Sequence, residues 1–107
     1  MTSGRPYSLV YAPITKKHLA AIESREHSLI RVNIEEQLQY EPEKETRNRK
    51  PLKRPVTFGA KWEIRFGSDN RYRVFYRVER DTRQVIILAI GEKKGERLFI
   101  GGKEVEL

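Results

Sequence analysis

The chain has 107 residues, of which 35% are charged and 37% hydrophobic, with a net charge of +7. This length predicts a single domain over residues 1–107, with a flexible tail at residues 1–6. The absence of Cys excludes disulfides, thiol catalysis and Cys-ligated zinc, and two His are too few for a metal site. We therefore expect no metal and no cofactor. Because no segment approaches the roughly 20 apolar residues of a membrane span or resembles a signal peptide, we expect a soluble, cytoplasmic protein without a membrane partner.

The N-terminal part of the chain predicts a strand followed by a short helix. Residues 7–11 are an aromatic and β-branched run closed by Pro13, which is typical of a strand. Thr15 follows as a plausible N-cap, and Leu19 and Ile22 give the next segment one apolar face.

A second amphipathic helix is expected between Ser28, as its N-cap, and Pro42, which ends it. Its apolar side chains recur every four residues, so one face can pack against the rest of the protein while the other contacts solvent. These apolar residues are Ile30, Ile34 and Leu38. His18 and His27 lie on or beside the two helices and are expected to be ordinary helix-surface residues rather than ligands.

After a polar and basic loop at residues 43–59, the pattern changes to alternation with a period of two. Residues 62–66 and 72–78 both alternate, and the turn cluster at residues 67–70 joins them into an antiparallel hairpin. One face of the hairpin is apolar and can receive the helices. The opposite face carries Glu63, Arg65, Arg73 and Arg77.

The C-terminal part predicts more strands of the same sheet. Residues 85–90 are continuously apolar, as expected for a central strand buried on both faces. Gly101-Gly102 is a tight turn between the runs at residues 98–100 and 104–106. The predicted fold class is therefore α+β: an N-terminal strand, a helical hairpin, and then an antiparallel β-meander with the helices on one sheet face and a basic opposite face.

The positive charge is concentrated in one segment of the chain. Between Arg47 and Arg77 there are ten basic and two acidic residues, a local charge of +8, so the remainder sums to −1. Such a segment suits a phosphate backbone or an acidic protein partner. A basic surface that only contacts solvent has the same composition.

Five segments follow one another with a characteristic order and spacing: 40–42 (YEP), 47–52 (RNRKPL), 62–67 (WEIRFG), 72–78 (YRVFYRV) and 87–94 (ILAIGEKK). In these segments, and over roughly residues 7–100, the chain resembles the RelE/ParE superfamily of toxins from toxin–antitoxin modules. It implies a small toxin neutralised by a cognate antitoxin. In the RelE branch it implies an endonuclease that cuts mRNA on the ribosome without a metal, and in the ParE branch a gyrase poison.

The resemblance also implies a site. Carried across residue by residue, the strand arginine of the RelE pattern falls on Arg73, a second basic position on Arg65, and the basic residue after the strand-ending glycine on Lys93. Glu63 stands at another basic position of the pattern and Phe99 at its C-terminal Tyr. Two of the five positions therefore differ in chemistry from the pattern.

Metal-free RNA cleavage needs a group that takes the 2′-hydroxyl proton, cations that stabilise the transition state, and a proton donor for the leaving oxygen. Arg supplies only the second, because it does not deprotonate. Glu63 is either the base or a partner that orients Arg65 and Arg73, while Lys61, Lys94 or Arg97 could compensate for the altered positions. The side chains expected to hold RNA are Lys50, Lys53, Arg54, Lys61, Arg77, Lys94 and Arg97.

Three functions remain open from the sequence. The first is a RelE-like mRNA endonuclease whose partners are an antitoxin and mRNA on the ribosome. The second is a ParE-like inhibitor of DNA gyrase, and the third is a non-catalytic RNA-binding module whose basic face only positions phosphates. Arg65 and Arg73 favour the first, whereas Glu63 and Phe99 favour the other two. A purely structural role is also open, in which Arg65 and Arg73 form an exposed cross-strand ion pair with an acid such as Glu63.

Overall fold

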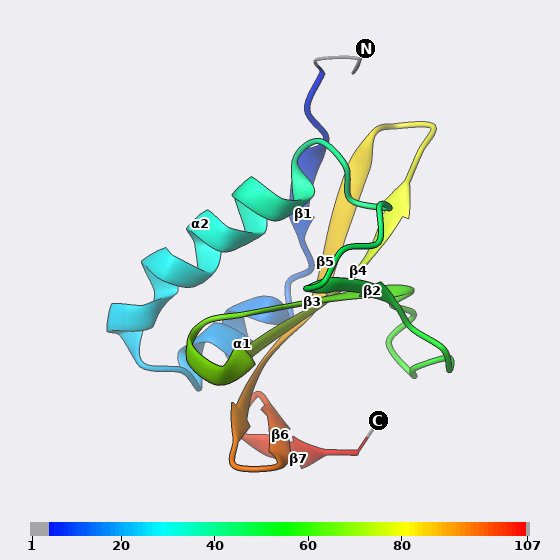
Figure 1. Cartoon of the computed structure of the whole chain (residues 1–107). Coiled ribbons are helices and arrows are strands. Elements are labelled where there is room, and N and C mark those ends of the chain that lie inside the picture. The colour runs from blue at the N-terminus through cyan, green and yellow to red at the C-terminus, as the bar shows by residue number, and fades with distance from the viewer. Residues whose placement is uncertain (1–4, 107) are drawn as a thin grey trace.

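The computed structural model describes residues 5–106 and shows a twisted sheet with two helices on one face (Figure 1). The first four residues of the predicted N-terminal tail lie outside the described part. In chain order the elements are β1 (Ser8–Tyr11), α1 (Thr15–Ala20), a 3₁₀ turn (Ser24–Glu26), α2 (His27–Leu38), β2 (Arg49–Pro51), β3 (Trp62–Phe66), a second 3₁₀ turn (Ser68–Asn70), β4 (Tyr72–Glu79), β5 (Gln84–Lys94), β6 (Arg97–Ile100) and β7 (Lys103–Val105).

The sheet confirms the predicted antiparallel meander and its central strand. The strand order is β2-β3-β4-β5-β6-β7, with all neighbours antiparallel. Strand β5 lies between β4 on one side and β6 and β1 on the other. The β1 strand pairs with the first half of β5 in parallel, with Leu9 opposite Val85. The N-terminal strand thereby becomes an edge of the same sheet.

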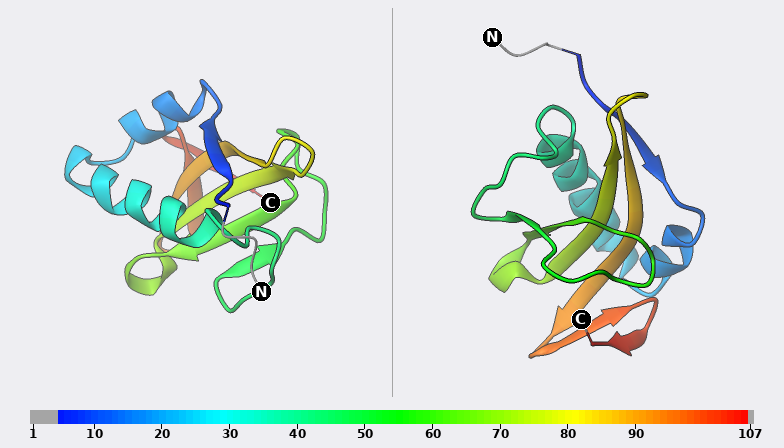
Figure 2. Two further views of the ribbon diagram at one scale, coloured as in Figure 1. Left: turned by 90° about the horizontal axis from the view of Figure 1, so that it is seen from above. Right: turned by 90° about the vertical axis from the view of Figure 1, so that its right-hand side faces the viewer.

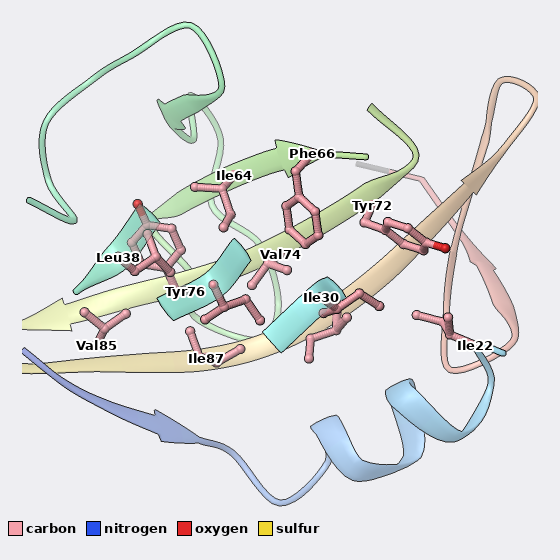
Figure 3. Packing of buried hydrophobic residues seen from close by; sticks show 12 residues of the cluster. Ile22, Ile30, Leu38, Ile64, Phe66, Tyr72, Val74, Tyr76, Val85 and Ile87 are labelled. Atoms are coloured by element: carbon pink, nitrogen blue, oxygen red, sulfur yellow. The ribbon is translucent and has the colours of Figure 1, made fainter. Parts of the chain in front are cut away.

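The main hydrophobic core lies between α2 and the sheet (Figure 3). The three apolar residues predicted for the packed face of α2 are all buried, and they meet the apolar face of β3, β4 and β5. Tyr72 and Tyr76 are fully buried in this cluster, on the apolar hairpin face that the alternation of residues 72–78 predicts. Their hydroxyls remain satisfied, because Tyr72 donates to Glu26 at 2.7 Å and Tyr76 to the Pro42 carbonyl at 2.6 Å.

A second apolar cluster covers part of the opposite sheet face, which the sequence predicted to be basic. Phe75 and Ala89 are buried there, and the loop before β3 packs on them through Leu52, Val56 and Phe58. In Figure 2 (right) this loop lies in front of the sheet and α2 behind it. The prediction of a basic face was therefore only partly right, because an apolar loop covers its middle.

A bulge in β5 allows its continuous apolar run to contribute side chains to both faces of the sheet. Phe75 pairs with Ala89 but the next residue of β4, Tyr76, pairs with Ile87, so Leu88 is an extra residue in β5. A bulge of this kind shifts the alternation of side chains. Ile87 and Ile90 consequently join the main core, while Leu88 and Ala89 contact the second cluster.

The predicted helix boundaries are wrong in three places. Thr15 is the first residue of α1 and not its N-cap, and its hydroxyl donates to the Ala12 carbonyl at 2.7 Å. Ser28 lies inside α2, because the 3₁₀ turn leads directly into His27. Helix α2 ends at Leu38, four residues before Pro42, which is buried beneath Tyr76 instead of terminating the helix.

Both histidines hold the structure together and are not the helix-surface residues that the sequence predicted. His18 is 9% exposed, and its Nδ1 accepts a hydrogen bond from the Ile90 backbone N–H at 3.2 Å. His27 Nε2 contacts the carbonyls of Leu19 and Ile22 at 2.7 and 2.9 Å. Since both partners are acceptors, this nitrogen carries the proton and closes the C-terminal end of α1.

No helix within residues 5–106 is long and apolar enough to cross a membrane.

Candidate functional site

Glu63, Arg65 and Arg73 come together on the sheet face opposite the helices. Arg65 on β3 pairs directly with Arg73 on β4, and Glu63 lies two residues before Arg65 on the same side. One oxygen of Glu63 lies 3.1 Å from Arg65 and the other 3.5 Å from Arg73. The carboxylate thus separates two guanidinium groups that would otherwise repel each other across the strands.

Burial makes this ion cluster unlike an ordinary surface pair. The side chains of Glu63 and Arg73 are 8% and 13% exposed, whereas that of Arg65 is 41% exposed. Burial and the neighbouring Arg65 lower the pKa of Arg73, and Glu63 opposes this shift. The Nε atom of Arg73 is buried without a hydrogen-bond partner in the structure. This donor is shielded from solvent, so a ligand in contact with Arg73 would meet the other nitrogens of its guanidinium group.

An open groove of about 830 Å³ runs over this cluster, a volume within the range of ligand-binding sites. Its wall on one side is the loop before β3, which contributes Lys53 and Arg54. Its other side is the hairpin of β6 and β7, which contributes Arg97 and Leu98. The groove therefore brings together six residues that the sequence predicted for the site: Lys53, Arg54, Glu63, Arg65, Arg73 and Arg97.

Strand register decides which C-terminal site residues share this face. Gly91 pairs with Arg73, so Lys93, two residues later, lies on the face of Arg73 but outside the groove lining. Lys94 and Phe99 lie on the opposite face, where the Lys94 Nζ sits 5.4 Å from the Phe99 ring and both line a small cavity beside His18. Phe99, which stands at the Tyr position of the RelE pattern, thus faces away from Arg73.

The remaining predicted RNA-binding residues lie outside the groove. Lys50, paired with Glu63 across β2 and β3, is 3.3 Å from Glu45, and Arg77 is 3.4 Å from Glu79. Lys61 is exposed immediately before β3 and has no ion-pair partner within residues 5–106. In the same described part, Lys53 and Arg54 are also without an ion-pair partner.

Two arginines of the basic segment have structural roles that its charge alone did not reveal. Arg49 is 8% exposed and donates to the carbonyls of Gln37 and Lys44, beside the end of α2. Arg71 bonds the buried Glu92 at 2.7 Å on the helix side of the sheet. The segment therefore distributes its charge over both faces, because Arg71 precedes β4 in a helical backbone conformation and does not share the face of Arg73.

Three acidic residues that the sequence did not assign to the site also line the groove: Glu96, Glu104 and Glu106. Glu104 lies 3.6 Å from Arg97 across the hairpin of β6 and β7. The Gly101-Gly102 turn was a signal for this hairpin, but the strand pattern did not show that the hairpin curls toward Arg73. Within residues 5–106 no group of His, Asp and Glu is arranged to hold a metal ion.

The fold is that of RelE-like proteins. It matches a chain in the crystal structure of the toxin–antitoxin complex RelBE2 from Mycobacterium tuberculosis, with a TM-score of 0.65 and 19% sequence identity, over 87% of this chain and 98% of that one. The predicted likeness of fold is thereby confirmed. No curated protein sequence gives a match.

Residues 19–99 match the model of the family described as "Phage derived protein Gp49-like (DUF891)", and the chain belongs to that family. The matched region begins within α1 and ends within β6. It therefore includes Glu63, Arg65, Arg73 and the loop before β3, whereas the groove residues 104–106 lie beyond it.

Proposed function

We propose that this chain is the toxin of a toxin–antitoxin module and that it inhibits translation by cutting mRNA on the ribosome without a metal ion. The observation that carries the proposal is the pair of Arg65 and Arg73, side by side on the floor of an open groove that three further cationic residues line. The RelE-like fold supports the toxin role, since the matching chain comes from a toxin–antitoxin complex. A cognate antitoxin is the expected protein partner.

The two arginines supply the electrostatic part of the reaction. A phosphodiester attacked by its own 2′-hydroxyl gains negative charge on the non-bridging oxygens, and fixed guanidinium groups stabilise that charge. Arg73 is held by Glu63 and by burial, so it is oriented before the substrate arrives. Arg65 is more exposed and can turn toward the phosphate.

Proton transfer requires other groups than the arginines. Both oxygens of Glu63 are bound by arginines, which makes this carboxylate better suited to orient Arg65 and Arg73 than to accept a proton. Lys93 shares the face of Arg73 and is the proposed proton-transfer residue. It reaches the scissile phosphate only if the substrate extends past the groove toward the end of β5.

Lys53, Arg54 and Arg97 are proposed to hold phosphates next to the cleaved bond, because they line the groove. Lys50, Lys61 and Arg77 lie outside it, so their contacts would involve nucleotides further along the strand or the ribosome. Lys94 is no longer part of the proposed RNA surface, since it faces the helix side beside Phe99.

The test is induced expression of the chain and of Arg73→Ala, followed by growth measurement and mapping of mRNA ends. We expect the native chain to stop growth and to produce cuts inside translated frames, and Arg73→Ala to abolish both. The matched control is Arg71→Ala, which removes an arginine two residues away that bonds Glu92 on the other face. The control should retain cleavage if its fold is retained.

Thermal unfolding separates loss of chemistry from loss of fold. Arg73→Ala should lower the melting temperature far less than Ile87→Ala, which removes a fully buried core side chain at a cost of about 2–5 kcal/mol. Equal losses in the two variants would show that Arg73 is structural and would refute the assigned site.

Two observations favour non-catalytic alternatives. Glu63 partly neutralises both arginines, and Phe99 places no hydroxyl in the groove. Growth arrest with intact mRNA and a defect in DNA supercoiling would support a gyrase inhibitor of ParE type instead. RNA binding without growth arrest would support a module that only positions phosphates.

A further inference from the structure

Phe58, in the loop before β3, is an aromatic side chain of the groove to which the site described above gives no role. Among the groove residues within 5–106 it is the only aromatic one. Its ring packs on the fully buried ring of Phe75 in a T-shaped contact, with 5.6 Å between the ring centroids and 75° between the ring planes. Phe58 itself is half-buried, so part of its surface remains open to the groove.

Strand register places this aromatic contact beside the two arginines. Phe75 lies two residues after Arg73 on β4 and pairs with Glu63 on β3, while Arg73 pairs with Arg65. Alternate residues of a strand point to the same face and are separated by about 7 Å along it. Phe58 therefore rests on the sheet position next to Arg73, on the face that carries both arginines.

Backbone contacts within the loop fix Phe58 in this place. The Leu52 N–H donates to the Lys61 carbonyl at 2.8 Å and closes the base of the loop, and the Gly59 N–H donates to the Val56 carbonyl at 3.1 Å. Gly59 has a φ of +79°, which glycine adopts without strain. Phe58 lies between Val56 and Gly59 in this turn, so its ring is positioned before a ligand enters the groove.

Two cations of the same loop accompany the ring. Lys53 and Arg54 are exposed, line the groove and make no ion pair within the described residues 5–106. Sites for single-stranded nucleic acid combine these two features, because cations hold the phosphates while the bases stack on aromatic side chains. The chemistry around Phe58 therefore fits a strand with unpaired bases better than it fits a lone anion.

We propose that Phe58 stacks on a nucleobase of the strand whose phosphate Arg65 and Arg73 bind. The proposal rests on the proposed function and deepens it, since the ligand is a single strand of RNA. A base offers its face to the ring only when it is unpaired and splayed out, so the site excludes double-stranded nucleic acid. Because every base has a π-face, the contact tolerates different sequences.

The test compares the binding of two fluorescent DNA strands of about 12 nucleotides, a length that spans a typical single-strand site. One is an oligodeoxyadenylate, and the other is an abasic strand with the same number of phosphates. Both lack the 2′-hydroxyl, so they report binding without cleavage. The difference between them separates contacts to the bases from contacts to the phosphates.

Three variants are measured beside the native chain. Phe58→Leu keeps an apolar side chain on Phe75 but removes the ring, and Phe58→Trp keeps an aromatic ring. Tyr40→Leu is the matched control, because it removes an aromatic ring that is 54% exposed and lies outside the groove.

We expect the native chain to bind the oligodeoxyadenylate more tightly than the abasic strand. Phe58→Leu should weaken binding of the oligodeoxyadenylate about tenfold, which is within the range measured for the loss of one stacked base, and binding of the abasic strand by less than about twofold. Phe58→Trp should bind both strands as the native chain does or more tightly. Tyr40→Leu should leave both affinities unchanged.

Equal losses on the two strands in Phe58→Leu would overturn the proposal, because Phe58 would then only hold the loop that carries Lys53 and Arg54. A native chain without preference for the strand that carries bases would also overturn it, and this measurement does not depend on the folding of a variant. These outcomes are independent of cleavage. A chain that never stops growth would refute the proposed toxin function and leave the stacking contact measurable.

Discussion

Glu63 is a single acidic residue that changes the charge and the geometry of an otherwise basic site. The sequence left two roles open for it, and the structure places its carboxylate between Arg65 and Arg73. A carboxylate whose two oxygens each face a guanidinium has its lone pairs engaged and is a weak proton acceptor. The geometry therefore favours the orienting role.

We predict that Glu63→Gln lowers the rate of single-turnover cleavage on programmed ribosomes by less than about tenfold. A general base would instead lose about 10² to 10⁴ in the chemical step. Glu92→Gln is the matched control, because Glu92 is as buried, with a side chain 7% exposed against 8% for Glu63, and pairs with Arg71 away from the groove. A loss of about 10³ or more in Glu63→Gln, with fold and binding unchanged, would make Glu63 the base.

His18 is a second residue whose role depends on its surroundings. Its Nδ1 accepts the Ile90 N–H, so the ring is neutral with its proton on Nε2. Burial lowers the pKa of His18 below the ordinary value of 6.5. The unfolded chain then binds more protons than the folded one in the interval between the two pKa values, so the stabilisation is complete above about 6.5 and is lost as pH falls through the folded pKa.

We predict that the free energy of unfolding falls between about pH 7.5 and pH 5.5, and that His18→Gln reduces this dependence. The loss of unfolding free energy in the native chain amounts to about 1.4 kcal/mol for each unit by which folding lowers the pKa of His18. Chemical denaturation of both proteins at the two pH values measures it. An identical pH dependence in the two proteins would show that protonation of His18 is not coupled to folding.

At the scale of elements, the end of α2 depends on a side chain from β2. The last carbonyls of a helix have no partner within it. Arg49 donates to the carbonyl of Gln37, inside the last turn of α2, and at 3.0 Å to that of Lys44 beyond the helix. One residue of the basic segment therefore anchors α2 to the sheet.

We predict that Arg49→Met destabilises the fold by about 2–4 kcal/mol, because hydrogen bonds from a charged donor contribute about 1.5–3 kcal/mol each. The neighbouring substitution Lys50→Met should cost less than about 1 kcal/mol, since Lys50 makes one exposed ion pair with Glu45. Urea unfolding of the two variants gives both values. Similar costs would mean that the Arg49 contacts do not anchor α2.

Whole-molecule charge governs the encounter with a protein partner. The chain carries a net charge of +7, and an acidic antitoxin segment is attracted over a Debye length of about 8 Å at physiological salt. We predict that its association rate falls as salt rises from about 50 to about 500 mM, a range that spans strong and weak screening. Stopped-flow association measures this, and a rate independent of salt would refute an electrostatically guided encounter.

Periodicity in the sequence determined most of the elements of this fold. The four-residue spacing of Ile30, Ile34 and Leu38 predicted the buried face of α2, and the alternation in β3 and β4 predicted that Arg65 and Arg73 share a face. These predictions succeeded because they follow from the geometry of one helix or one hairpin, where residues close in sequence are close in space.

The tertiary structure alone decided which charges meet. The bulge at Leu88 changes the face of the residues that follow it in β5. It therefore determines on which sheet face Lys93 and Lys94 lie, and no local sequence pattern reveals it. The loop before β3 and the C-terminal hairpin come to line one groove, and the fold brings Arg49 to α2 and His18 to Ile90. Each of these contacts joins segments distant in the chain, and only the packing of the whole sheet fixes their distance.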